Sequence, residues 1–275
     1  MDNYTLNNKS SISVFPSDKE SSIVIYLHGG GLIYGSRSDI PSPLIDTFNS
    51  NGITVISIDY LLAPNSHLDD ILFELYTSYK EIKSTYIKEL PYWLCGRSSG
   101  AFLMLQLMAY ISSENLTFPL GLINFYGYYD LDFYLNRANK KTNKIKLSKE
   151  DIQNLLTDPK IKVWDDPSMS RFPLYIYALQ EKLSLEYLGV NESNITNYEL
   201  NEGILSNFPP VFSTASTSDK EVPFTYSKQL YRIVKNSHFV PVYYLEHDFL
   251  SLSNETEVEK VYNQLDKWIT IHNII

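Results

Sequence analysis

Short apolar runs alternate with amphipathic stretches through the first half of the chain. The runs are bounded by Gly, Pro, Asn or Asp, as is typical of buried strands. They cover residues 23–27, 53–58, 92–95 and 120–126. Apolar residues recur every three to four positions over 68–82, which predicts an amphipathic helix. Further helices are predicted at 44–49 and 101–111. Regular alternation of this kind predicts a mostly parallel sheet covered by helices on both faces.

The alternation stops after about residue 127 and resumes near residue 207. Between these points the pattern is helical, with the clearest helices at 151–156 and 174–188. Beyond them, strands are predicted at 211–215 and 240–245, and helices at 224–234 and 255–271. We therefore expect one α/β core, built from residues 1–127 and 207–275, with a helical cap at 128–206 inserted before the last two strands.

Composition narrows the class of protein. The chain has 23 Lys and Arg against 32 Asp and Glu, a net charge of −9, which argues against nucleic acid as a partner. A single cysteine excludes a disulfide framework and a zinc site built mainly from thiolates. No apolar run reaches the roughly 18–20 residues of a membrane span, and no secretory signal is visible, so a cytoplasmic protein is expected. A homo-oligomer is compatible with the sequence.

The predicted cap is rich in aromatic and basic residues. Six Lys or Arg lie between residues 136 and 149, which we interpret as a solvated helix face. Ten rings lie in or beside the cap, and most are expected to be packing, with a minority lining a pocket. The ten are Tyr128, Tyr129, Phe133, Tyr134, Trp164, Phe172, Tyr175, Tyr177, Tyr187 and Tyr198.

The strongest chemical signal is the pentapeptide Gly96-Arg97-Ser98-Ser99-Gly100, which matches G-x-S-x-G. A predicted strand leads into it and a predicted helix follows it. So tight a turn strains the central residue and leaves no room for side chains at the outer glycines. Ser98 is thus predicted to be a nucleophile exposed at the carboxyl edge of the sheet. The alternative is a small-residue turn with ordinary N-capping serines.

A second signal is His28-Gly29-Gly30-Gly31, directly after the first predicted strand. Acyl transfer builds an oxyanion that needs preorganised N–H donors, and glycines let the backbone approach closely enough to supply them. This strand should lie beside the strand of Ser98, so the loop's amides can face the same point. His28 and Gly29 are expected to support the loop, with the imidazole bracing the turn.

A rival reading of the glycines is dinucleotide binding. Gly29, Gly31 and Gly35 follow a strand, and Asp59 ends the next one. That motif needs a helix that begins at the glycines, whereas residues 32–40 are irregular and prolines at 41 and 43 delay the helix. No P-loop motif is present in the sequence.

A nucleophilic serine needs a base, and position in the predicted sheet selects among the histidines. The chain has five, His28, His67, His238, His247 and His272. His238 precedes its predicted strand, at the opposite edge from Ser98, whereas His247 follows that strand on the same edge. We therefore predict His247 as the base.

The base needs a carboxylate to hold its tautomer. Asp219 follows the predicted strand 211–215 on the carboxyl edge. Glu221 and Asp248 are competing carboxylates nearby. The order Ser98, Asp219, His247 is the order used by nucleophile-elbow hydrolases, so Asp219 is preferred.

These motifs together resemble an α/β-hydrolase of the hormone-sensitive-lipase-like carboxylesterase group. The resemblance rests on HGGG at 28–31 with LIYG after it, DYLLAP at 59–64, GRSSG at 96–100, and His247. It implies an α/β-hydrolase fold and oxyanion donors from the backbones of Gly30, Gly31 and Ser99. It also implies no cofactor and no metal.

The chain departs from this family at three points. Arg97 and Ser99 flank the serine, where the family has an acidic and a small residue, G-D-S-A-G. After Asp219 the chain reads Lys220-Glu221 in place of the family's D-x-L. Only about 20 residues precede the first predicted core strand, so the lid must come mostly from 128–206.

The sequence thus predicts a serine carboxylic-ester hydrolase that acts on small, short-acyl esters. Absence of an interfacial helix disfavours attack on lipid droplets. A peptidase or an acyltransferase with the same residues stays open, as does a non-catalytic binding module. The binding module is disfavoured because all three predicted catalytic residues are present.

Overall fold

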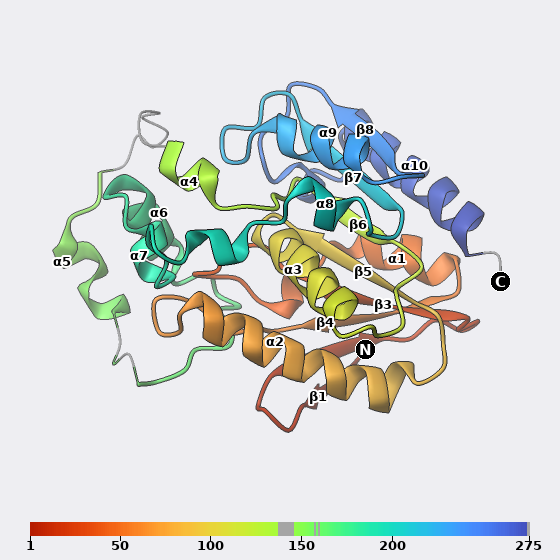
Figure 1. Cartoon of the computed structure of the whole chain (residues 1–275), viewed down its shortest axis with the longest axis horizontal. Coiled ribbons are helices and arrows are strands. Elements are labelled where there is room, and N and C mark those ends of the chain that lie inside the picture. The colour runs from red at the N-terminus through yellow and green to blue at the C-terminus, as the bar shows by residue number, and fades with distance from the viewer. Residues whose placement is uncertain (137–145, 157, 159, 274–275) are drawn as a thin grey trace.

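An eight-stranded sheet forms the centre of the described chain, with strand order β1-β2-β4-β3-β5-β6-β7-β8 (Figure 1). The computed structural model describes residues 1–136, 146–156, 158 and 160–273. The strands are β1 Asp2–Thr5, β2 Ser11–Phe15, β3 Ser22–Leu27, β4 Ile53–Ile58, β5 Tyr92–Arg97, β6 Leu122–Phe125, β7 Val211–Ser216 and β8 His238–Val242.

Strands β3 to β8 are parallel, and their carboxyl ends share one edge of the sheet. Strand β1, at the edge of the sheet, and its neighbour β2 are antiparallel to the strands they pair with and come from the first 21 residues, for which no element was predicted. Every residue of β1 is exposed, so this strand carries no hydrophobic pattern that would reveal it. The parallel part, with fully buried strands such as β3, β4 and β5, confirms the predicted α/β class.

Helices cover both faces of the sheet and bury two apolar cores. On one face lie α1 (Ser42–Ser50) and α10 (Thr256–His272), and on the other α2 (Leu68–Ile82), α3 (Ser99–Ser113) and α9 (Phe224–Ile233). Helix α3 is mostly apolar because it is buried nearly all round, as the run at 101–111 indicated. None of the helices within the described ranges combines the length and apolarity that a membrane crossing requires.

Between β6 and β7 the described residues form helices and loops, and we call residues 128–206 the inserted segment. Helices α5, α6 and α7 gather at the left of Figure 1, beyond the sheet. The helices are α4 Asp132–Asn136, α5 Lys149–Ile152, α6 Phe172–Gln180, α7 Ser184–Tyr187 and α8 Glu202–Leu205, with single 3-10 turns at Gln153–Leu155 and Ile195–Tyr198. Most of the basic run at 136–149 lies outside the described residues.

Three predicted elements differ from the structure. The helix expected at 151–156 is instead the end of α5, at Ile152, followed by the 3-10 turn Gln153–Leu155. The single helix expected at 174–188 is broken between α6 and α7, because Lys182 adopts φ 62° and the amide of Leu183 bonds the carbonyl of Ala178. This left-handed helix end is usually marked by glycine, and here no glycine marks it. The strand expected at 240–245 is β8, which ends earlier, since Tyr244 (φ 64°) turns the chain out of the sheet. His247 therefore follows β8 after a short turn.

Candidate active site

Ser98 lies in a tight turn between β5 and α3, with φ 53° and ψ −120°. A Cβ on Gly96 would lie 2.5 Å from both the Gly100 carbonyl oxygen and the Ala101 Cα, and one on Gly100 would lie 2.1 Å from the carbonyl oxygen of His28. All three contacts are with backbone atoms, which cannot move aside as a flexible side chain could. The two outer glycines of the pentapeptide are thus required by packing, and the turn presents Ser98 at the carboxyl edge of the sheet.

The structure brings Ser98, His247 and Asp219 into one hydrogen-bonded chain. His247 Nε2 lies 2.8 Å from Ser98 Oγ, and His247 Nδ1 lies 2.6 Å from Asp219 Oδ2. Because a carboxylate can only accept, Nδ1 carries the proton and Nε2 is left to accept from the serine hydroxyl. Asp219 Oδ1 accepts the backbone amides of Glu221 (2.8 Å) and Val222 (3.0 Å), which fix the carboxylate.

The surroundings of His247 favour its protonated form. Burial disfavours the charge, but the hydrogen bond and negative charge of Asp219 outweigh burial and raise the pKa of His247 above 6.5. Glu221 and Asp248 add to this rise. The Tyr126 ring packs edge-on against the imidazole, with centroids 4.8 Å apart, and restricts its rotation.

The two competing carboxylates bind other partners. Glu221 accepts the hydroxyl of Tyr175 at 2.6 Å. Asp248 accepts Arg97 Nη1 at 3.1 Å and the hydroxyl of Tyr126 at 3.0 Å. Of the three candidate acids, Asp219 is therefore the one hydrogen-bonded to His247.

The glycine loop lies against Ser98. A Cβ on Gly29 would lie 3.5 Å from the Ser98 Cβ, and Gly30 and Gly31 have φ values of 111° and 61°, which favour glycine. Within the described chain, the amides of Gly30, Gly31 and Ser99 donate no hydrogen bond to protein. Ser99 begins α3, so its amide belongs to the unpaired first turn of that helix. The three predicted donors therefore have no protein acceptor within the described residues.

His28 and the motif at 59–64 brace this loop. The His28 Nδ1 donates to the Gly29 carbonyl at 2.7 Å, and the ring stacks on Tyr60 at 4.1 Å. Burial lowers the pKa of His28 to about 4, so the ring is neutral. The Tyr60 hydroxyl donates to the His28 carbonyl at 2.8 Å. Asp59 is buried and accepts the amide and guanidinium of Arg37, an arrangement that does not fit ribose binding.

The inserted segment is tied to the glycine loop. Arg171 is buried and donates to the carbonyls of Ile33 (2.8 Å) and Ala63 (2.7 Å). The amide of Asp166 donates to the Gly35 carbonyl at 2.8 Å. The position of the glycine loop thus depends on residues from the inserted segment.

A cavity of about 310 Å³ opens above Ser98 and His247. Tyr34, Tyr126 and Tyr175 form part of its wall, and a Cβ on Gly31 would lie 2.4 Å from the Tyr175 ring. Tyr128 and Tyr198, by contrast, are buried in the apolar core. Tyr128 and Tyr198 therefore serve as packing, whereas Tyr175 forms part of the pocket wall.

No group of three His, Cys, Asp or Glu within the described chain is placed to hold a metal. Cys95 is buried in β5, and burial raises the pKa of its thiol, which disfavours the reactive thiolate.

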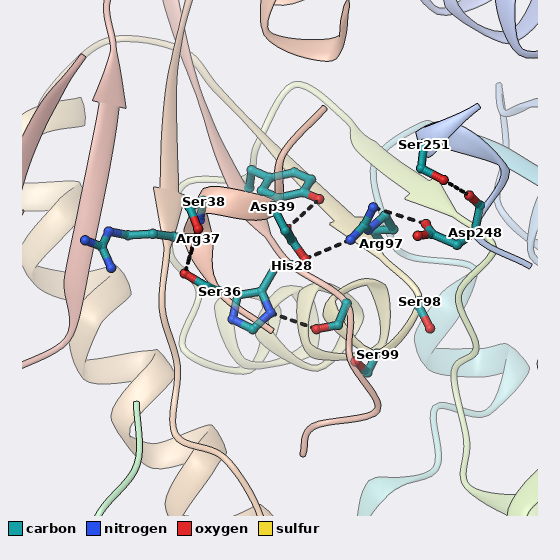
Figure 2. Close-up of polar contacts among 12 residues, drawn as sticks. His28, Ser36, Arg37, Ser38, Asp39, Arg97, Ser98, Ser99, Asp248 and Ser251 are labelled. Carbon is teal, nitrogen blue, oxygen red and sulfur yellow. Dashed lines mark hydrogen bonds and ion pairs between the residues drawn. The ribbon is translucent and has the colours of Figure 1, made fainter. Parts of the chain in front are cut away.

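Sequence reasoning missed the contacts that surround these residues. Arg97 was read only as a departure from the family pattern, yet its guanidinium binds Asp39 and Asp248 (Figure 2). Arg171 and Tyr175 carried no motif. The unusual charge at position 97 was the one available signal, and its partners come from segments far away in the sequence.

Comparison with known proteins agrees with the fold. A family model described as alpha/beta hydrolase fold matches residues 24–172, more than half of the chain. The chain therefore belongs to the α/β-hydrolase family. The crystal structure of an alpha/beta hydrolase superfamily protein from Enterococcus faecalis is 43% identical, covers 98% of this chain and 97% of that one, and superposes with a TM-score of 0.93.

More distant similarities include proteins with named activities. A kynurenine formamidase from Salmo salar is 28% identical over 46% of this chain, and an esterase from Acinetobacter venetianus 26% identical over 50%. The matches span only 44% and 46% of those relatives' own lengths. The structure of an esterase from the bacterial hormone-sensitive lipase family, 14% identical, has a TM-score of 0.69 over 99% of this chain and 84% of its own. At that identity the likeness concerns the fold.

Proposed function

We propose that this protein is a serine hydrolase that cleaves carboxylic esters, with Ser98 as nucleophile, His247 as general base and Asp219 as the acid that orients it. The observation that carries the proposal is the hydrogen-bonded chain from Ser98 Oγ through both ring nitrogens of His247 to Asp219. Nucleophile, base and orienting acid at these distances are the requirement for acyl transfer.

In the first half-reaction Ser98 Oγ attacks the acyl carbon while His247 Nε2 takes the serine proton. The oxyanion that forms is stabilised by the amides of Gly30, Gly31 and Ser99. His247 then gives the proton to the leaving alcohol as the C–O bond breaks. In the second half-reaction His247 activates a water, which releases the acyl group and regenerates Ser98.

Short-acyl substrates are favoured by the size of the site. A cavity of about 310 Å³ is near the small end of ligand pockets. Three tyrosine rings wall it, so it suits a compact, partly polar substrate. We propose residues 128–206 as a cap on the core, because Arg171 and Tyr175 from that segment contact the glycine loop.

Because one named relative is a formamidase, an amide-cleaving activity with the same residues is the second candidate. Peptidase and acyltransferase activities use the same machinery and differ only in leaving group or acceptor. These activities are separated by substrate, not by the catalytic residues.

The test is turnover of p-nitrophenyl acetate, butyrate and octanoate, beside a formanilide, by wild type, Ser98→Ala and His247→Ala. We expect acetate or butyrate to be cleaved fastest, and both variants to lose at least about a thousandfold in kcat. A fluorophosphonate should label wild type at Ser98 and leave Ser98→Ala unlabelled. A pure, folded wild type that neither turns over nor labels would exclude the proposal.

A further inference from the structure

Arg97, the second residue of the pentapeptide, is held between two carboxylates at the wall of the cavity that also holds Ser98 and His247. Its Nη2 lies 2.7 Å from Asp39 Oδ2 and its Nη1 lies 3.1 Å from Asp248 Oδ1 (Figure 2). The Arg97 side chain is 11% exposed, against 28% for Asp39 and 56% for Asp248. The guanidinium is thus largely enclosed, and each of its two ends is bound to a different acid.

The two acids belong to different parts of the site. Asp39 ends the short 3-10 turn Arg37–Asp39, which follows the glycine loop of the oxyanion donors. Asp248 directly follows His247, and Arg97 directly precedes Ser98. One guanidinium therefore bridges the segments that carry the oxyanion donors, the nucleophile and the base. In the sequence, Asp39 lies 58 residues from Arg97 and Asp248 lies 151 residues from it.

Each carboxylate is itself held by a buried tyrosine. The Tyr126 hydroxyl donates to Asp248 Oδ1 at 3.0 Å, and the same ring packs against the His247 imidazole. The Tyr26 hydroxyl lies 3.5 Å from Asp39 Oδ1. A displacement of Asp248 would therefore move both the backbone next to His247 and the ring that packs on it.

We propose that Arg97 is a positioning residue. Through Asp39 and Asp248 it keeps the glycine loop, the nucleophile Ser98 and the base His247 in fixed positions relative to one another. The inference rests on the proposed function of Ser98 and His247. A buried ion pair contributes little net stability, because desolvation offsets the attraction, but its directional bonds fix geometry. Small displacements of reacting groups cost large factors in rate. Arg97 should thus matter more to kcat than to folding.

The central variant is Arg97→Met, which keeps an unbranched, flexible side chain and removes the guanidinium and its charge. Burial already raises the pKa of Asp39 to about 6 despite Arg97, so without the arginine this carboxyl can take a proton and remain buried. We expect kcat for p-nitrophenyl acetate to fall about 10- to 100-fold, with KM changed less than about threefold. Arg97→Lys should recover only part of the loss. It restores the positive charge, but its single ammonium group cannot bind both acids as the two ends of the guanidinium do. Arg232→Met, at an exposed arginine on α9, is the matched control and should retain wild-type kcat.

Non-additivity distinguishes positioning from a general loss of stability. Asp248→Asn alone should lower kcat several-fold, but should add less than about twofold in the Arg97→Met background, because the contact is already lost. The pH profile of kcat/KM provides a second readout. The charges that raise the pKa of His247 are Asp219, Glu221 and Asp248. Asp248→Asn should move the acid limb to lower pH, whereas Arg97→Met, which leaves Asp248 unneutralised, should move it to higher pH.

The proposal would be overturned if the kcat of Arg97→Met lay within twofold of that of an active wild type. It would also be overturned if the fold-losses in kcat of Arg97→Met and Asp248→Asn simply multiplied in the double variant. If Arg97→Met does not fold by circular dichroism, the Asp39→Asn, Asp248→Asn cycle decides instead. Positioning through the shared guanidinium requires that cycle to be non-additive, and additive effects refute it. An inactive, unlabelled wild type counts against the proposed function and not against the role of Arg97.

Discussion

Asp219→Asn should nearly abolish activity while leaving the fold intact, because the structure dictates which way the new amide faces. Asp219 Oδ1 accepts two backbone amides, at 2.8 and 3.0 Å, from Glu221 and Val222. Only the carbonyl oxygen of an asparagine can accept them. The side-chain NH₂ must then point to His247 Nδ1, where Asp219 Oδ2 lies at 2.6 Å in the wild type.

This orientation places the histidine in the wrong tautomer. Facing an NH₂ donor, Nδ1 has to accept, so the ring proton moves to Nε2. Nε2 lies 2.8 Å from Ser98 Oγ and can then no longer accept the serine proton. The proposed general base is then lost, although every atom is expected to stay close to its position in the wild type.

The size of the effect follows from the cost of turning the amide round. A flipped asparagine leaves the two backbone N–H groups facing an NH₂, and each unmade hydrogen bond costs about 1–3 kcal/mol. The correct tautomer is therefore disfavoured by about 2–6 kcal/mol, which corresponds to a loss of about 30- to 10⁴-fold in rate, with about 10³-fold as the central value. Since the preferred orientation keeps both backbone bonds, the free energy of unfolding should change by less than about 1 kcal/mol.

The assay compares kcat on p-nitrophenyl acetate and urea unfolding for wild type, Asp219→Asn and Glu221→Gln. Glu221→Gln is the matched control, since it makes the same chemical change two residues away, on a side chain that accepts the hydroxyl of Tyr175. It should lose less than about tenfold in kcat. Retention of more than a tenth of the wild-type kcat by Asp219→Asn, or a greater loss in Glu221→Gln, would refute the reasoning.

Three further outcomes are expected. The pKa of His28 is about 4 in the folded chain and 6.5 unfolded, so its contribution to stability is complete above pH 6.5 and is lost as the pH falls towards 4. From pH 7 to 5, wild type should lose about 2 kcal/mol more unfolding free energy than His28→Gln in urea titrations, and equal losses would contradict this. Gly100→Ala places a Cβ 2.1 Å from one backbone oxygen and 2.2 Å from another, so thermal melts should show destabilisation of more than about 3 kcal/mol. Arg171→Met leaves the carbonyls of Ile33 and Ala63 without their donor. It should lower the unfolding free energy by about 2–4 kcal/mol and also lower kcat, and unchanged kcat would show that the glycine loop is held without it.

Much of the fold could be predicted because each buried parallel strand is a short continuous run of apolar residues. Strands β3, β4, β5 and β7 lie where apolar runs indicated, within one or two residues. The exposed edge strand β1 and the short strand β2 carried no such pattern. The break after α6 was also hidden, since Lys182 takes a conformation for which glycine is the usual signal.

The residues proposed for catalysis could be selected from sequence by a topological argument. Carboxyl ends of parallel strands share one edge, so Ser98, Asp219 and His247 were expected together, and the structure places them in hydrogen-bond contact. The same argument could not choose among Asp219, Glu221 and Asp248, which all lie near that edge. Asp219 is distinguished by the hydrogen bond from its carboxylate to His247 Nδ1. Whether a carboxylate reaches that nitrogen depends on the direction of its side chain and not on strand order.

The sequence by itself predicted the parallel part of the sheet, its helical covering, the two glycine-dependent turns and the placing of Ser98 and His247 at one edge of the sheet. These features are local, because they follow from hydrophobic period and from residues that only one backbone geometry tolerates. Only the tertiary structure decided that Arg97 joins Asp39 to Asp248, that Arg171 anchors the glycine loop, and that Tyr175 walls the pocket. Those contacts join segments far apart in the chain, and their partners are set by how the sheet and the inserted segment pack together, which no local pattern encodes.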